Sequence, residues 1–397
     1  MLRQRGRVGL MAAALVGLVV GSASAQVTTE RSSSILFFPK VISDGTRDVV
    51  IQITNTSNSM VHAHCFYVNG ALTFPDLPPG PINPPLWTEI DFDIWLTKQQ
   101  PTHWVVSQGR IVDPTDGGNP PCNDNPEITE CNDAGIDPGR VPPVVEYFTG
   151  ELKCIEVDPS GAPLSGNHLK GEATTIIADV CDPDIGECIL SDVACTSNTQ
   201  CDADLFDVAK YNAIGVIGNE NNDGDNILCL GGEPSDECPF GAEYDACPQF
   251  WIANHFSDGA PNPFFQDDVD DDSAVFTAWT VVPCTENFES QAPESVTLFI
   301  ETYNEFEQAV SSFLTVDCWG EVSLSDISNT FTFASLGTSF AQSRIRPTGQ
   351  TRSGIIMVGT EAHVTDDGVI STADVNYHVE GARPGPDIIT IPPEQIQ

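Results

Sequence analysis

Three carboxylates alternate along the short segment LWTEIDFDIW, residues 86–95. If this segment is a β-strand, one face carries Trp87, Glu89, Asp91, Asp93 and Trp95, because successive side chains of a strand point to opposite sides. The pattern has two interpretations: a carbohydrate site built from acids and tryptophans, or the solvated face of an amphipathic strand. We favour the second, because any half-buried strand shows this alternation of polar and apolar residues.

The same residues resemble the strand motif of laminarinase-like retaining glycoside hydrolases, a β-jelly-roll family. The resemblance implies Glu89 as nucleophile, Asp91 as the residue that keeps it ionised, and Asp93 as the acid/base. Retaining hydrolysis needs two carboxyl groups about 5–5.5 Å apart. Asp93 departs from the family pattern, which has a longer Glu at the catalytic acid. Catalysis is therefore the alternative reading, together with sugar binding through Trp87 and Trp95.

Two other patterns could hold metal ions. His62 and His64 form an H-x-H pair on one face of a predicted strand, the arrangement that zinc or copper can use. The segment NENNDGDN supplies alternating oxygen ligands around a glycine, and DDVDDDS is a second dense cluster of carboxylates. Hard oxygen ligands at such spacing suit calcium, whereas the alternative is a turn rich in Asx residues. The calcium candidates are Asn219, Asn221, Asp223, Asp225, Asp267, Asp268 and Asp270.

The first residues predict an export signal. Arg3, Arg5 and Arg7 precede an apolar run, which is followed by the small-residue pattern Ala23-Ser24-Ala25. We expect cleavage after Ala25 and a secreted, cell-surface or periplasmic protein with no membrane insertion after cleavage. Cleavage would remove three basic residues and no acid, which leaves a net charge of −44. Such a surface repels nucleic acid and favours calcium or cationic partners.

Thirteen cysteines in an exported chain predict disulfides. Cys122 and Cys131 bracket a short loop and are expected to pair, and Cys284 and Cys318 are expected to join neighbouring strands. The odd total leaves at least one thiol outside a disulfide, with Cys65 or Cys154 as the candidate. The remaining disulfide candidates crowd into one region: Cys181, Cys188, Cys195, Cys201, Cys229, Cys238 and Cys247.

Short alternating apolar segments, 32 glycines and 30 prolines predict an all-β fold, most simply an immunoglobulin-like or jelly-roll-like β-sandwich with long disulfide-pinned loops. We expect a first β-block over residues 26–112, an exposed linker over 113–140, and a second β-rich domain over 141–397. Cysteine-rich acidic loops interrupt the second domain at about 181–272. The first block includes a predicted hairpin, in which a strand with Val49, Ile51 and Ile53 on one face is followed by a polar turn and a second strand to Val68. The last segments, SGIIMVGTEAHV and STADVNYHVEG, predict another hairpin.

The stretch FFPKVISDGTRDVVIQITNTSNS, with LTKQQP later, resembles immunoglobulin-like modules of exported bacterial surface proteins. Such modules share a fold and no common activity. The chain carries no G-x-S-x-G, H-E-x-x-H or P-loop motif. We therefore expect a non-catalytic structural or interaction protein, whose partner is a protein or polysaccharide at the cell surface.

Overall fold

The computed structural model describes residues 27–74, 82–111, 137–178, 181–182, 187–188, 206–263, 273–291, 294–348, 353–365 and 368–392. The predicted signal segment with its cleavage site, most of the predicted linker, and the second calcium candidate Asp267, Asp268 and Asp270 lie outside these residues. So do Cys122, Cys131, Cys195 and Cys201. Strands make up 59% of the structure and helices 4%, which confirms the all-β prediction.

Two sheets contain most of the strands that come first in the chain. One has the order β11-β1-β6-β3-β4 and the other the order β10-β7-β2-β5. Their strands are β1 Ile35–Ser43, β2 Arg47–Asn55, β3 Val61–Asn69, β4 Thr88–Leu96, β5 Pro101–Val105, β6 Phe148–Val157, β7 Leu169–Ala178, β10 Phe206–Asn212 and β11 Ile214–Val216.

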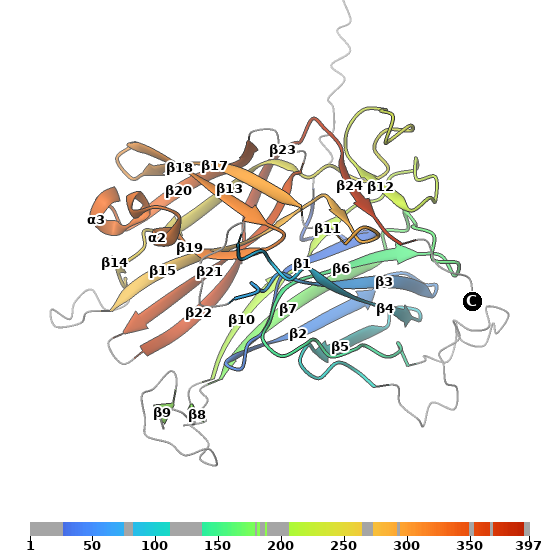
Figure 1. The fold of residues 1–397 in the computed structure, drawn as a ribbon, viewed down its shortest axis with the longest axis horizontal. Coiled ribbons are helices and arrows are strands. Elements are labelled where there is room, and N and C mark those ends of the chain that lie inside the picture. The colour runs from blue at the N-terminus through green and yellow to red at the C-terminus, as the bar shows by residue number, and fades with distance from the viewer. Residues whose placement is uncertain are drawn as a thin grey trace, which may run out of the picture.

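Three further sheets contain the later strands, in the orders β12-β24-β16, β18-β17-β20-β13-β23 and β14-β15-β21-β22, with β19 also paired to β15. Figure 1 shows these strands, in yellow to red, gathered mostly at one end of an elongated molecule. Their strands are β12 Ile227–Leu230, β13 Pro248–Phe256, β14 Ala260–Pro261, β15 Ala274–Pro283, β16 Glu286–Asn287, β17 Ser295–Asn304, β18 Ala309–Asp317, β19 Gly320–Ser323, β20 Phe340–Thr348, β21 Ile355–Thr365, β22 Gly368–Asn376, β23 His378–Ala382 and β24 Asp387–Thr390.

The remaining described elements are short strands and single-turn helices. Strands β8 Cys181–Asp182 and β9 Glu187–Cys188 form a two-stranded ribbon. Three single-turn helices, α2 Leu324–Ile327, η2 Asn329–Phe331 and α3 Phe333–Leu336, follow β19. Among the described residues, no helix has the length and hydrophobicity needed to cross a bilayer.

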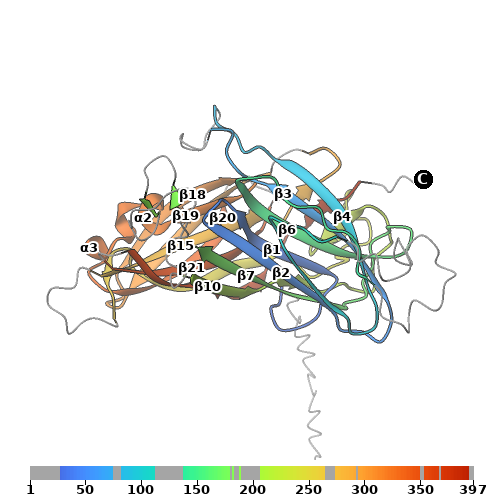
Figure 2. The same cartoon turned by 90° about the horizontal axis from the view of Figure 1, so that it is seen from below.

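The prediction of a β-sandwich is wrong. The five main sheets are arranged as in a five-bladed β-propeller. The alternation of polar and apolar residues identifies strands with one buried face, but sandwiches and propellers both pack sheets face to face, so the pattern does not distinguish them. Figure 2 shows the sheets from below, with β1 lying across the sheet of β2 and β7.

The predicted hairpin between the strand of Val49, Ile51 and Ile53 and the strand that ends at Val68 is also wrong. Both strands form at the expected positions, but β2 pairs with β5 and β7, whereas β3 pairs with β4 and β6. Strands β6, β7, β10 and β11 thus join sheets begun by the first block, so the two predicted blocks share sheets. The final hairpin is confirmed, because β21 pairs with β22.

Cysteine pairing differs from the prediction in two places. Cys65 and Cys154, the two candidates for the unpaired thiol, lie opposite one another on β3 and β6 and form a disulfide. Cys284 pairs with Cys247, and Cys318 is a buried free cysteine. Spacing along the chain does not reveal which strands are neighbours, so it could not identify these partners. Cys229 and Cys238 form a third disulfide.

A buried ion cluster joins the early strands to the later ones. Lys153 of β6 donates hydrogen bonds to Glu151 (Nζ–Oε1 2.8 Å) and to Glu286 of β16. The rings of Phe37 and Phe288 lie 5.2 and 5.7 Å from the same nitrogen. Burial raises the pKa of Glu151 to about 8, although Lys153 opposes this shift. Burial also raises the pKa of Glu286, so the cluster holds titratable carboxyl groups in the interior.

Candidate functional site

The histidine pair and the acidic strand, which the sequence presents as separate patterns, meet side by side. Antiparallel pairing of β3 with β4 sets His62 opposite Trp95 and His64 opposite Asp93. His62 Nε2 lies 2.7 Å from Asp93 Oδ1, and His64 Nε2 lies 3.1 Å from Asp91 Oδ2. The His62 ring also stacks on Trp95, with centroids 4.0 Å apart. Both histidines therefore serve as cross-strand partners of the carboxylates.

The electrostatics of this face oppose the roles that the hydrolase resemblance implies. Burial and the neighbouring Asp91 raise the pKa of Glu89 to about 7. The hydrogen bond from His64 lowers the pKa of Asp91. A nucleophile must be ionised at the start of a retaining reaction, but Glu89 is the carboxyl group whose charged form is disfavoured here. The implied acid/base, Asp93, is held by His62.

Both tryptophans of the predicted sugar-stacking face are buried. Trp87 and Trp95 are only 5% and 4% exposed, so neither ring offers a surface to a sugar. Trp87 precedes β4 and has a φ of 43°, which takes it off the alternating face of the strand and towards Phe288. Trp95 is covered by its contact with His62. The assignment of alternate residues to one face assumes an unbroken extended strand, and Trp87 does not meet this assumption.

The histidine pair has no free nitrogen at His62. Its Nε2 faces Asp93, and its Nδ1 lies 3.0 Å from the backbone oxygen of Asp158. Across the described residues, the one place where three such ligand atoms converge is Cys247, Cys284 and Asp387, and the two sulfurs there form a disulfide. Transition-metal binding at His62 and His64 therefore has no support from this geometry.

The first calcium candidate forms a turn closed by its own side chains. Asp223 Oδ1 accepts a hydrogen bond from the backbone N–H of Asp225, and Asp225 Oδ1 accepts one from Ile227. Asn222 caps Gly224 in the same way, and Gly224 has a φ of 74° that favours glycine. These are Asx-turn contacts, the alternative interpretation of the segment. Calcium binding there stays a prediction.

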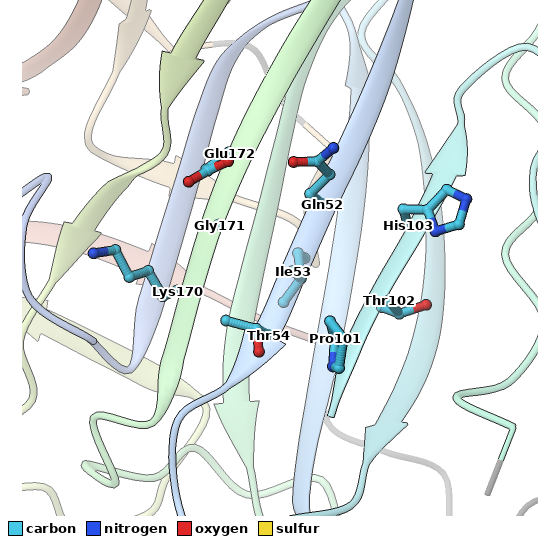
Figure 3. Close-up of a pocket in the computed structure, with 9 residues that line it drawn as sticks. All are labelled: Gln52, Ile53, Thr54, Pro101, Thr102, His103, Lys170, Gly171 and Glu172. Carbon is cyan, nitrogen blue, oxygen red and sulfur yellow. The ribbon is translucent and has the colours of Figure 1, made fainter. Parts of the chain in front are cut away.

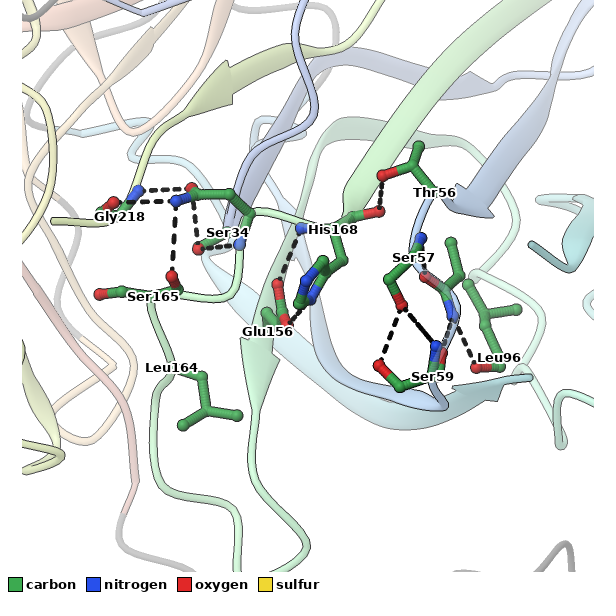
Figure 4. Close-up of polar contacts among 12 residues, drawn as sticks. Ser34, Thr56, Ser57, Ser59, Leu96, Glu156, Leu164, Ser165, His168 and Gly218 are labelled. Atoms are coloured by element: carbon green, nitrogen blue, oxygen red, sulfur yellow. Dashed lines mark hydrogen bonds and ion pairs between the residues drawn. The ribbon is translucent and has the colours of Figure 1, made fainter. Parts of the chain in front are cut away.

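A polar hollow of about 600 Å³ lies beside this loop and contains a carboxylate–histidine pair. Glu156 is buried, and burial raises its pKa, whereas the hydrogen bond with His168 lowers it. The Glu156 Oε1 atom lies 2.8 Å from His168 Nδ1. Figure 4 shows this pair, with Ser165 lying away from it and close to Gly218. Among the described residues, no hydroxyl forms a hydrogen bond with the His168 ring; the Thr56 hydroxyl donates one to the His168 backbone oxygen.

A second hollow, of about 370 Å³, lies on the sheet that contains β2, β5 and β7. Figure 3 shows Lys170 and His103 at opposite sides of it, with Glu172 of β7 and Gln52 of β2 between them. Glu172 forms an ion pair with Lys210. The residues are spread over the polar face of the sheet and do not converge on one point.

Another cavity lies between early and later strands. It has a volume of about 760 Å³, which lies within the range of ligand sites. We call it the β18–β19 cleft, because these two strands form one wall; the other wall comes from the segments after β3 and before β6. Its lining residues are Asp44, Gly70, Ala71, Leu72, Pro85, Tyr147, Thr149, Leu314, Thr315, Val316, Asp317, Trp319, Gly320, Glu321, Val322 and Asp326.

Trp319 is fixed at the base of the cleft. Its indole N–H donates a hydrogen bond to the backbone oxygen of Pro39, 2.8 Å away. A Cβ atom at Gly70 would lie 2.3 Å from Trp319 Cβ, so only glycine allows the two walls to approach this closely. Cys318 has a φ of 67° and turns the chain between β18 and β19. These contacts therefore fix the position of one wall of the cleft relative to the other.

The cleft is acidic at its rim and apolar inside. Of the described residues that line it, four are carboxylates and none is a lysine or an arginine. Arg47 pairs with Asp44 and Glu321 from outside the lining, and Lys40 lies 3.7 Å from Glu321. Asp317 and Asp326 form no ion pair with any lysine or arginine that the structure describes. The carboxylates without a basic partner thus lie at the end of β18 and in α2.

The sequence patterns missed this cleft. Its lining comes from many segments far apart in the chain, and only their pairing brings them together. One signal was present: the aromatic residues Tyr147 and Trp319 stand outside the regular alternation of the predicted strands. Tyr147 is 63% exposed, which is unusual for a large aromatic side chain.

Comparison with known proteins adds no family. No known protein family matches the chain, and no curated protein matches it. Among solved structures, it aligns with a chain from the "Cryo-EM Atomic Structure of Broad Bean Stain Virus" at 9% identity, which covers 94% of this chain and 98% of that one. The TM-score of 0.14 does not indicate a shared fold. The resemblance to immunoglobulin-like modules stays a prediction.

Proposed function

We propose that the chain is an exported, non-catalytic interaction protein that binds its ligand in the β18–β19 cleft. The observation that carries this proposal is the cleft itself: about 760 Å³, with Leu72, Leu314 and Trp319 inside and carboxylates at the rim. A few polar groups around an apolar interior are typical of binding sites. The acidic strand β4 offers less support for catalysis, because its carboxylates are engaged by His62 and His64.

The sequence supports export to the cell surface, the exterior or the periplasm. The basic, apolar and small-residue regions of residues 1–25 have the order of a signal peptide. The disulfides are consistent with an oxidising compartment. In that compartment, the partner is a protein or polysaccharide of the cell surface, and the acidity of the chain disfavours nucleic acid.

The test is a screen of the purified protein on immobilised peptide and glycan arrays. We expect the wild-type protein to capture ligands in the screen. The Trp319→Ala variant should bind these ligands at least tenfold more weakly, because it removes the largest side chain that lines the cleft. Ala71→Phe narrows the cleft without removing a wall and should give the same loss. Phe240→Ala is the matched control, because Phe240 is 61% exposed and lies outside the cleft.

Thermal melting of each variant separates loss of binding from loss of folding. The proposal is wrong if neither array yields a ligand, or if every captured ligand is retained by folded Trp319→Ala and Ala71→Phe.

A further inference from the structure

One wall of the cleft is made of unpaired strand edges. Within the described part of the chain, β18 pairs with β17 alone and β19 pairs with β15 alone. Figure 1 shows β18 at the margin of its sheet. The free side of such a strand presents a row of backbone N–H and C=O groups without partners, which is a template for another strand.

These free edges face the cleft. Four consecutive residues of β18, 314–317, line it, and so do three consecutive residues of β19, 320–322. A strand presents only alternate side chains to a cavity that lies over its face. Consecutive residues reach the same cavity when it lies along the edge of the strand. The cleft therefore runs beside the free backbone of both strands.

The side chains around the edge suit an extended segment with alternating residues. Leu314 and Val316 share one side of β18, and Leu72 stands on the opposite wall. Strand addition uses main-chain hydrogen bonds for affinity and pockets for alternate side chains for specificity. Asp317 is partly exposed and Asp326 is exposed, and both are without a cationic partner in the described structure. Such carboxylates favour a basic ligand.

We infer that the β18–β19 cleft binds an extended, basic polypeptide segment, which adds to the free edge of β18 as a further strand. This inference rests on the proposed function and names its ligand class. A polysaccharide would use the aromatic residues Tyr147 and Trp319 but would leave the backbone groups of β18 without partners. The free edge is thus the feature that selects a polypeptide.

The test uses a blocked octapeptide of alternating valine and lysine, with binding followed by fluorescence anisotropy of an attached dye. One control peptide has alternate amides N-methylated, which removes the donors on one edge; another replaces lysine with glutamate. We expect the first peptide to bind, and each control to bind at least tenfold more weakly. Hydrogen exchange should also slow at the backbone amides of β18 on binding.

Two variants test the charge. Asp326→Lys should weaken binding of the valine–lysine peptide several-fold. Asp236→Lys changes the net charge equally at another exposed aspartate, outside the cleft, and should leave binding within twofold. Equal effects of the two variants would mean that overall charge alone attracts the peptide, which overturns the inference.

The outcomes separate this inference from the proposed function. If N-methylation has no effect, or if glycans but no peptides bind in a Trp319-dependent manner, strand addition is wrong and the cleft remains a binding site. If no ligand of either class depends on Trp319 or Ala71, both proposals fail.

Discussion

Glu89 and Asp91 lie two residues apart on β4, yet their surroundings shift the two carboxyl pKa values in opposite directions. Burial and the charge of Asp91 raise the pKa of Glu89 to about 7, whereas the hydrogen bond from His64 lowers that of Asp91. Opposite shifts in neighbouring carboxyls often mark active sites. Here burial accounts for the shift of Glu89 and the cross-strand hydrogen bond from His64 for that of Asp91, so we interpret the pair as part of the packing between β3 and β4.

The Glu89 shift predicts a specific pH dependence of stability. The folded pKa lies above the usual value, so the folded state binds more protons than the unfolded chain between about pH 4.5 and 7. This contribution is fully present below pH 4.5 and is lost as pH rises through 7. We expect Glu89→Gln to abolish that loss, so the variant gains stability relative to wild type between pH 5 and pH 8.

Urea denaturation at both pH values measures the difference. Glu380→Gln is the control, because the Glu380 side chain is 58% exposed. An equal pH dependence of wild type and Glu89→Gln would contradict the assigned environment of Glu89.

The positions of individual strands could be predicted from the sequence where the residues of the strand itself determine them. Strands β2, β3 and β4 and the β21–β22 hairpin form where alternation and turn residues predict them. Pairing between distant strands was not predictable, because β3 is buried along its whole length and carries no pattern that identifies its neighbours. The same limit explains why His62 and Asp93, 31 residues apart, appeared as two separate motifs.

The disulfides provide a test at the level of elements. Cys65–Cys154 closes a loop with a sequence separation of 89, and Cys229–Cys238 one with a separation of 9. Chain entropy predicts that replacing the first pair by alanine costs about 4–5 kcal/mol, and replacing the second about 2–3 kcal/mol. Guanidinium denaturation of the two double variants measures both values. A larger loss for the Cys229–Cys238 variant would contradict this ordering.

At the scale of the whole molecule, charged residues hold the early and later strands together from within. Lys153 connects β6 to β16, and Lys40 lies 2.7 Å from Asp374 of β22. Both lysines are almost completely buried. A buried pair adds little net stability, but removal of one partner leaves an uncompensated charge. These lysines therefore make the relative placement of the sheets sensitive to single substitutions.

We predict that Lys153→Met lowers the free energy of unfolding by about 3–5 kcal/mol at pH 7, because Glu151 and Glu286 lose their shared cation. Urea denaturation gives the value. Lys210→Met, which removes an exposed ion pair with Glu172, should cost no more than about 1 kcal/mol. Adding Glu151→Gln and Glu286→Gln to Lys153→Met should recover part of the loss; no recovery would assign the effect to packing.

The position of β24 has a consequence for how the chain matures. It pairs with β12 on one side and in parallel with β16, the strand of Glu286, on the other. β24 is synthesised after all of these, so β16 lacks its neighbour until residues 387–390 have emerged. A chain that stops before residue 387 contains all the other described strands. It lacks β24, the neighbour of the strand that carries Glu286. The placement of β24 is thereby coupled to the position of the Glu286 carboxylate that faces Lys153.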